Sequence, residues 1–191
     1  MFNRKKQHKA AFSLIEMIVS MSIIVLLTAL FLANYRASNK RTDLVMTAQV
    51  LVTDIRYAQA NALGLVKYDG AMPSGGWGVH FSSLDANNSN YIIFADSNDN
   101  KEYDDGEAAE NLGGRIVSLP TNIIIKEILL GQNASTSANN FDVTFLPPDP
   151  QTRLYNGIED SNVARIVLEN TASGDEKTIY LNFLGLVEVE D

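Results

Sequence analysis

One acidic segment, residues 96–107 (DSNDNKEYDDGE), carries oxygen atoms at a spacing that could hold a divalent cation. Counted from its first residue, side-chain oxygens fall at positions one, three, five, nine and twelve, and position seven offers a backbone carbonyl. Six to eight oxygens from one loop are the ligands that Ca²⁺ prefers, and a final glutamate can bind it through both oxygens. The candidate calcium ligands are Asp96, Asn98, Asn100, Asp104, Glu107 and, through its carbonyl, Glu102.

Position six weakens this interpretation. EF-hand-like loops place glycine there for a sharp turn, whereas this segment has Lys101, which needs a strained backbone and adds a positive charge. The alternative is a solvated acidic turn, since Asp and Asn favour turns without any metal. The residues leave both alternatives open, and no cofactor other than Ca²⁺ is expected.

A second carboxylate, Glu16, is the only charged side chain in an apolar run from Phe12 to Ala33. A charge inside a membrane is costly and is usually partnered or functional. Cleavage after Ala11 would give Phe12 a new amine, with Glu16 four residues, or about one helical turn, further along. The amine of a neighbouring, staggered copy could then pair with Glu16, most strongly where the dielectric is low. The pattern therefore predicts an assembly contact made by Phe12 and Glu16.

The element that must position this contact is a membrane-spanning helix. As a helix the run is about 33 Å long, enough to cross a hydrocarbon core of about 30 Å. Four basic residues precede it, which predicts a single-pass protein in the cytoplasmic membrane with its leader inside and its body outside. A secretory signal would place small residues after the apolar run, but Ala10 and Ala11 lie before it. An uncleaved anchor would leave Glu16 unexplained.

The stretch Lys9–Glu16 (KAAFSLIE) resembles the prepilin cleavage and methylation motif of type IV pilins and type II secretion pseudopilins. The resemblance implies that a prepilin peptidase cuts between Ala11 and Phe12 and methylates the new amine. It also implies that Glu16 guides insertion into a growing filament at the cell surface or in the periplasm. The implied partners are other subunits, the peptidase, the inner-membrane assembly platform and, before assembly, lipid. The family usually has Gly where this chain has Ala11, so slower processing is expected.

The rest of the chain predicts an α+β fold. Small and apolar residues recur at steps of three and four from Leu44 to Ala62, so the first helix should continue as an amphipathic helix and end near Gly64. Strand-like runs follow at 77–83, 91–95, 115–119, 123–130, 141–146, 163–169 and 177–190, the last bent, bulged or folded as a hairpin near Gly185. Residues 131–140 look like an exposed loop. The expected divisions are a leader (1–11), a membrane or filament-core helix (12–33), its continuation (34–64) and a β-rich head (65–191).

Several segments together are similar to the GspH/FimT branch of minor pilins and pseudopilins. They are the helix segment 54–62 (DIRYAQANA), Gly76–Val79, 93–100 (IFADSNDN) and Asp105–Glu107. Some FimT-type pilins bind DNA through basic residues near the C-terminus. Here residues 186–191 (LVEVED) contain no basic residue, and the net charge of the whole chain is −8, so DNA binding is not expected.

The composition argues against an enzyme. The chain has no cysteine and two histidines, His8 in the leader and His80, so a thiol nucleophile or a histidine-based metal site is not expected. His80 is interpreted as structural and Trp77 as a core residue. Two functions remain: a structural filament subunit, or a membrane-tethered exported domain that binds calcium through its acidic loop and does not polymerise.

Overall fold

The computed structural model of the protein describes residues 13–84, 87–105, 107, 114–131, 136–147 and 151–190. The chain divides into two compact units, residues 1–39 and 40–191. The described residues contain one α-helix, α1 (Leu14–Leu63, 50 residues), followed by strands that pair only antiparallel. The predicted α+β layout with one long helix is therefore confirmed, while Ala11 and Phe12 lie outside the described residues.

Helix α1 ends at Leu63, directly before Gly64, as the sequence predicted. The Leu65 amide donates to the Ala62 carbonyl (3.1 Å) and the Val66 amide donates to the Asn61 carbonyl (2.9 Å). This is the hydrogen-bond pattern of a Schellman motif, in which the residue after the cap adopts a left-handed conformation. That residue is Leu65 (φ 54°), so Gly64 closes the helix but does not supply its left-handed turn.

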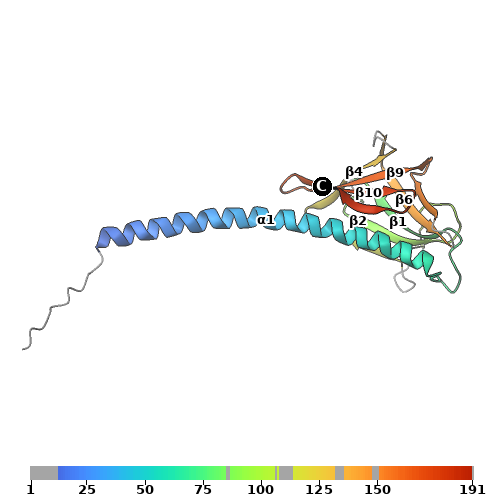
Figure 1. Ribbon diagram of the computed structural model, residues 1–191, viewed down its shortest axis with the longest axis horizontal. Helices are drawn as coiled ribbons and strands as arrows, with labels where there is room; N and C mark the ends of the chain where they lie inside the picture. The colour runs from blue at the N-terminus through green and yellow to red at the C-terminus, as the bar shows by residue number, and fades with distance from the viewer. Residues whose placement is uncertain are drawn as a thin grey trace, which may run out of the picture. The chain divides into compact units, whose positions relative to one another are not determined.

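The second half of α1 contributes one stripe to the core of the head. As the spacing predicted, its buried residues include Leu44, Ala48, Leu51, Ile55, Ala58 and Ala62. These side chains belong to the same apolar cluster as residues from both β-sheets, including Phe81 and Ile125. The strands of the head lie along this half of the helix (Figure 1). All described residues of this apolar cluster therefore lie within the unit 40–191.

A polar contact also ties the helix to the strands. Asp54 is buried on α1 and accepts a hydrogen bond from the Tyr91 hydroxyl (2.6 Å). The same carboxylate pairs with Arg115, whose guanidinium lies over the Tyr57 ring at 5.3 Å. Burial, reinforced by the hydrogen bond to Asp54, raises the pKa of Tyr91. This network connects one face of the helix to two neighbouring strands.

The strands form two sheets. The six-stranded sheet has the order β3-β2-β1-β6-β7-β8. Its strands are β1 (Gly76–Ser82), β2 (Asn90–Asp96), β3 (Arg115–Ser118), β6 (Asn140–Leu146), β7 (Gln151–Tyr155) and β8 (Asp160–Ser161). The five-stranded sheet has the order β11-β10-β9-β4-β5. Its strands are β4 (Ile123–Leu130), β5 (Thr136–Ala138), β9 (Val163–Asn170), β10 (Asp175–Asn182) and β11 (Val187–Glu190).

The strand predictions hold for the apolar runs and fail for the polar ones. All seven predicted runs contain strand, and the last is a hairpin, β10–β11, that turns at Gly185 (φ 82°). The loop prediction for 131–140 is wrong at residues 136–138, where the small polar strand β5 pairs with β4, and at Asn140, the first residue of β6. Strands β7 and β8 were not predicted, since their sequences are short and mostly polar. Trp77 is buried as predicted, and its Nε1–H donates to the Val66 carbonyl (3.0 Å).

Candidate functional site

The first part of α1 presents apolar side chains that the chain itself does not cover. Residues 14–32 form a helical segment long and apolar enough to cross a membrane, and none of it is buried within the protein. Its large apolar side chains remain exposed, among them Leu14, Ile15, Ile18, Leu26 and Leu27. Such a surface needs lipid or other protein chains around it.

Two hydroxyl side chains in this segment are satisfied locally. The Ser22 hydroxyl donates to the Ile18 carbonyl (2.8 Å), and the Thr28 hydroxyl donates to the Ile24 carbonyl (2.7 Å). A hydroxyl that bonds back to its own helix leaves no polar group without a partner in hydrocarbon. Neither residue therefore opposes burial of the segment in a membrane or a helix bundle.

Glu16 lies in the first turn of α1. The Ser13 side chain caps the helix by accepting a hydrogen bond from the Glu16 amide (3.2 Å). Ser13 and Glu16 have the S-x-x-E spacing of a capping box. This spacing is visible in the sequence and would have predicted the start of the helix. No hydrogen bond or ion pair of the Glu16 carboxylate is found among the described residues. Its pairing with the Phe12 amine stays a prediction, because Phe12 lies outside those residues.

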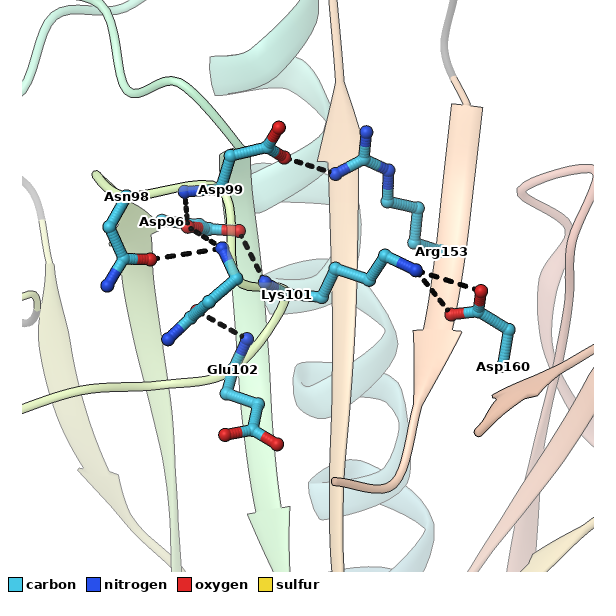
Figure 2. A network of polar contacts seen from close by, with 8 residues as sticks. Asp96, Asn98, Asp99, Lys101, Glu102, Arg153 and Asp160 are labelled. Carbon is cyan, nitrogen blue, oxygen red and sulfur yellow. Dashed lines mark hydrogen bonds and ion pairs between the residues drawn. The ribbon is translucent and has the colours of Figure 1, made fainter. Parts of the chain in front are cut away.

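The acidic loop begins at the buried last residue of β2 and closes on itself. Asp96 accepts backbone N–H hydrogen bonds from Asp99 (2.6 Å) and Asn100 (3.3 Å) on one oxygen and from Lys101 (3.0 Å) on the other. Figure 2 shows these amides gathered around the carboxylate. Burial raises the pKa of Asp96, and the backbone hydrogen bonds oppose that rise. Asp96 thus organises the turn through its own backbone.

The remaining candidate ligands are also hydrogen-bonded within the loop. Glu107 accepts bonds from the Ser97 amide (2.8 Å) and hydroxyl (2.6 Å) and from the Asp104 amide (3.1 Å). The Asn98 and Asn100 amide groups each donate to one oxygen of Asp104 at 2.8 Å. The Glu102 amide donates to the Asn100 side chain at 2.9 Å. The predicted ligands are therefore neighbours, but their oxygens face N–H groups.

Lys101 has the strained backbone that the sequence predicted, with φ at 72°, and Asp99 is also left-handed at 62°. The Lys101 ammonium extends away from the turn to both oxygens of Asp160 on β8 (2.9 and 2.8 Å). Arg153 on β7 donates to Asp99 (2.5 Å), as Figure 2 shows. Two ion pairs therefore attach the loop to β7 and β8. The loop supplies the cation in one pair (Lys101) and the anion in the other (Asp99).

Gly75 leaves room for the Asp96 carboxylate because it has no side chain. Gly75, just before β1, donates its amide to the Asp96 carbonyl (2.8 Å). A Cβ atom at this position would lie 1.9 Å from an Asp96 carboxylate oxygen. The side chain of Asp96 therefore occupies the space that any side chain at position 75 would need.

No group of three or more His, Cys, Asp or Glu side chains in the described part of the chain is arranged to hold a metal. For Ca²⁺ to bind the acidic loop, its oxygens would have to exchange these N–H hydrogen bonds for the ion. Calcium binding stays a prediction. What the described geometry provides is a self-closed turn fixed by Asp96 and Glu107.

Comparison with known proteins identifies the N-terminal segment. Residues 6–32 match the family model described as the prokaryotic N-terminal methylation motif. No curated protein and no solved structure matches the chain. The matched range contains Ala11, Phe12 and Glu16 and does not extend into the head. It supports the interpretation of the chain as a prepilin-processed subunit of the type IV pilin and pseudopilin class, whose members are structural proteins.

Proposed function

We propose that the protein is a structural subunit, a minor pilin or pseudopilin of the GspH/FimT-like branch, in a type IV pilus or type II secretion-like filament. The observation that carries the proposal is an uncovered apolar helix with one carboxylate, Glu16, inside the range that matches the methylation motif. Before assembly the subunit spans the cytoplasmic membrane with its leader inside. After cleavage between Ala11 and Phe12 it enters the filament.

The physics of transfer from lipid to filament explains why one charge matters. Lipid tails are as apolar as the side chains of residues 14–32, so moving this helix into a bundle gains little hydrophobic free energy. An unpaired acidic residue costs about 2.5–3.5 kcal/mol at the centre of a membrane helix, and the cost falls toward the helix end, where Glu16 lies. Pairing with the Phe12 amine of a neighbouring subunit removes that cost in one axial register only. Glu16 thereby selects the inserted position.

The partners in this proposal are other pilin or pseudopilin subunits, prepilin peptidase and the inner-membrane assembly platform. The filament lies at the cell surface or in the periplasm. The second candidate, a tethered calcium-binding domain that does not polymerise, rests on the ligand spacing of residues 96–107 alone.

Two substitutions at one position test the assembly role. Glu16→Ala should abolish incorporation into filaments while membrane insertion and the folded head persist. Glu16→Gln separates charge from capping, because glutamine can complete a capping box but cannot neutralise an amine. Incorporation should therefore fail in both variants, as measured by the amount of subunit in sheared or purified filaments.

The matched control is Ser22→Ala, which also removes a polar group from this helix. The Ser22 hydroxyl donates to the Ile18 carbonyl of the same helix. This variant should assemble normally. Normal incorporation of Glu16→Gln would show that capping, and not charge, is what position 16 provides. Mass spectrometry of the wild type should find a mature chain that starts at methylated Phe12.

A further inference from the structure

A polar pocket of about 290 Å³ lies on the face of the six-stranded sheet that is turned away from the core. Along β1, Val79 and Phe81 point into the core, so His80 and Ser82 point to the opposite face. His80 and Ser82 line the pocket together with Asn90 and Ile92 from β2. The acidic loop contributes Tyr103 and Asp105 to the same pocket.

His80 is held in one orientation by a buried acid. Its Nδ1 lies 2.8 Å from a carboxylate oxygen of Asp142, which is buried on the neighbouring strand β6. The Tyr103 ring packs against the imidazole, with the ring centres 5.5 Å apart. When the imidazole is neutral and Nδ1–H donates to Asp142, Nε2 is left as a hydrogen-bond acceptor. In that state His80 offers an acceptor to its pocket.

The other polar groups lining the pocket can also accept hydrogen bonds, while the two asparagine amides and the Ser82 and Tyr103 hydroxyls can donate as well. Asp105 is acceptor-only when ionised, and Asn87 and Asn90 each carry a carbonyl oxygen. No hydrogen bond is found for these three side chains within the described residues. The nearby Lys101 is already paired with Asp160, so its charge does not neutralise Asp105. The pocket thus carries one negative charge, on Asp105, beside the side chains of His80, Asn87 and Asn90, each of which can present an acceptor.

We propose that this pocket binds the guanidinium group of an arginine side chain from a neighbouring protein subunit. A guanidinium is planar, always charged and carries five N–H donors, which suits several acceptors converging on one space. The Tyr103 ring adds a surface on which a guanidinium can stack. Ile92 and Ile116 in the pocket lining give the aliphatic part of the side chain an apolar contact.

That the arginine comes from another filament subunit rests on the proposed function, whereas recognition of guanidinium does not. The test therefore uses binding alone. The full chain in detergent micelles, labelled with ¹³C-histidine, is titrated with N-acetyl-arginine amide at pH 8. The two histidines, His8 and His80, give two signals. A saturable change in the His80 Hε1 signal, with His8 unchanged, is the expected result.

Three further probes define specificity. N-acetyl-citrulline amide has the same shape without the charge, and it should bind about tenfold more weakly or worse. N-acetyl-lysine amide should bind more weakly than the arginine probe because it lacks the planar fork. Glucose tests a polyol instead of a cation. Equal binding of citrulline, or preferential binding of glucose, would overturn the proposal.

Asp105→Asn identifies the pocket as the place of binding. Asp105 is exposed, so this substitution should leave the fold intact while it lowers affinity for the arginine probe about tenfold or more. Asp175→Asn, an exposed acid on β10 in the other sheet, is the control and should bind as the wild type does. An arginine response that is absent in the wild type, or unchanged in Asp105→Asn, contradicts the proposal whether or not the chain forms filaments.

Discussion

Replacing Asp96 with alanine should destabilise the head, because this carboxylate closes the acidic loop. Asp96 accepts three backbone hydrogen bonds, two of them at 3.0 Å or less. A hydrogen bond to a charged acceptor contributes about 1.5–3 kcal/mol, and the exposure of residues 97–100 to water favours the lower value. Two such bonds give about 3 kcal/mol, and the cost of burying the charge offsets part of this. We expect a loss of about 2 kcal/mol in the free energy of unfolding.

The assay is urea and thermal unfolding of residues 40–191, the unit that holds the whole apolar core. For a domain of this size a loss of 2 kcal/mol corresponds to a fall in Tm of about 4–8 °C. Asp96→Asn keeps an oxygen acceptor without the buried charge, so its loss should be about half as large.

Asp104→Ala provides the matched control in the same loop. Asp104 is exposed and its carboxylate accepts bonds only from the side-chain amides of Asn98 and Asn100, so its removal should cost about 0.5 kcal/mol or less. If Asp96→Ala also lay within about 0.5 kcal/mol of the wild type, the organising role assigned to Asp96 would be wrong.

Three further predictions concern the same fragment. Burial raises the pKa of Asp142, so its stabilising contribution is full below the unfolded pKa of about 4 and declines as pH rises through the folded pKa. Asp142→Asn should remove the part of that decline that sets in above about pH 4 in urea unfolding, and parallel curves for variant and wild type would contradict the assignment. Asp54→Ala leaves the Tyr91 hydroxyl and Arg115 without their acceptor and should cost about 2–4 kcal/mol, whereas a loss below 1 kcal/mol would mean that water replaces Asp54. If residues 96–107 bind calcium as their spacing predicts, millimolar Ca²⁺ should raise the Tm of the wild type and not that of Asp96→Ala; no shift, or equal shifts, would remove the calcium hypothesis.

The sequence predicts those features of the fold that depend on apolar periodicity. The stripe from Leu44 to Ala62 fixes which face of α1 is buried, and runs such as Ile123–Leu130 fix strands in the core. Strand β5 (TSA) could not be predicted in this way, because it is polar and exists through pairing with β4. Pairing across the chain is a tertiary property that local patterns do not contain.

The same limit applies to the acidic loop. Within the loop Asn98 donates to Asp104 and the Asp99 amide donates to Asp96, and Lys101 has a left-handed backbone, in line with the strain expected of a residue at the usual glycine position. The spacing cannot show that Asp96 would accept amides of its own turn, nor that Lys101 would reach Asp160 some sixty residues away. Long-range partners such as Arg153 and Asp160 lie on strands that were themselves not predicted.

The closeness of Gly75 to Asp96 has a consequence for how this sequence can change over evolutionary time. A methyl group at position 75 would overlap a carboxylate oxygen that closes the acidic loop. The overlap disfavours replacement of Gly75 alone, and the loss of the loop hydrogen bonds disfavours replacement of Asp96 alone. Once a small side chain stands at 96, a larger one at 75 no longer overlaps a carboxylate. Among related chains the two positions should covary, and a homologue that has lost the acid should also be free to lose the glycine.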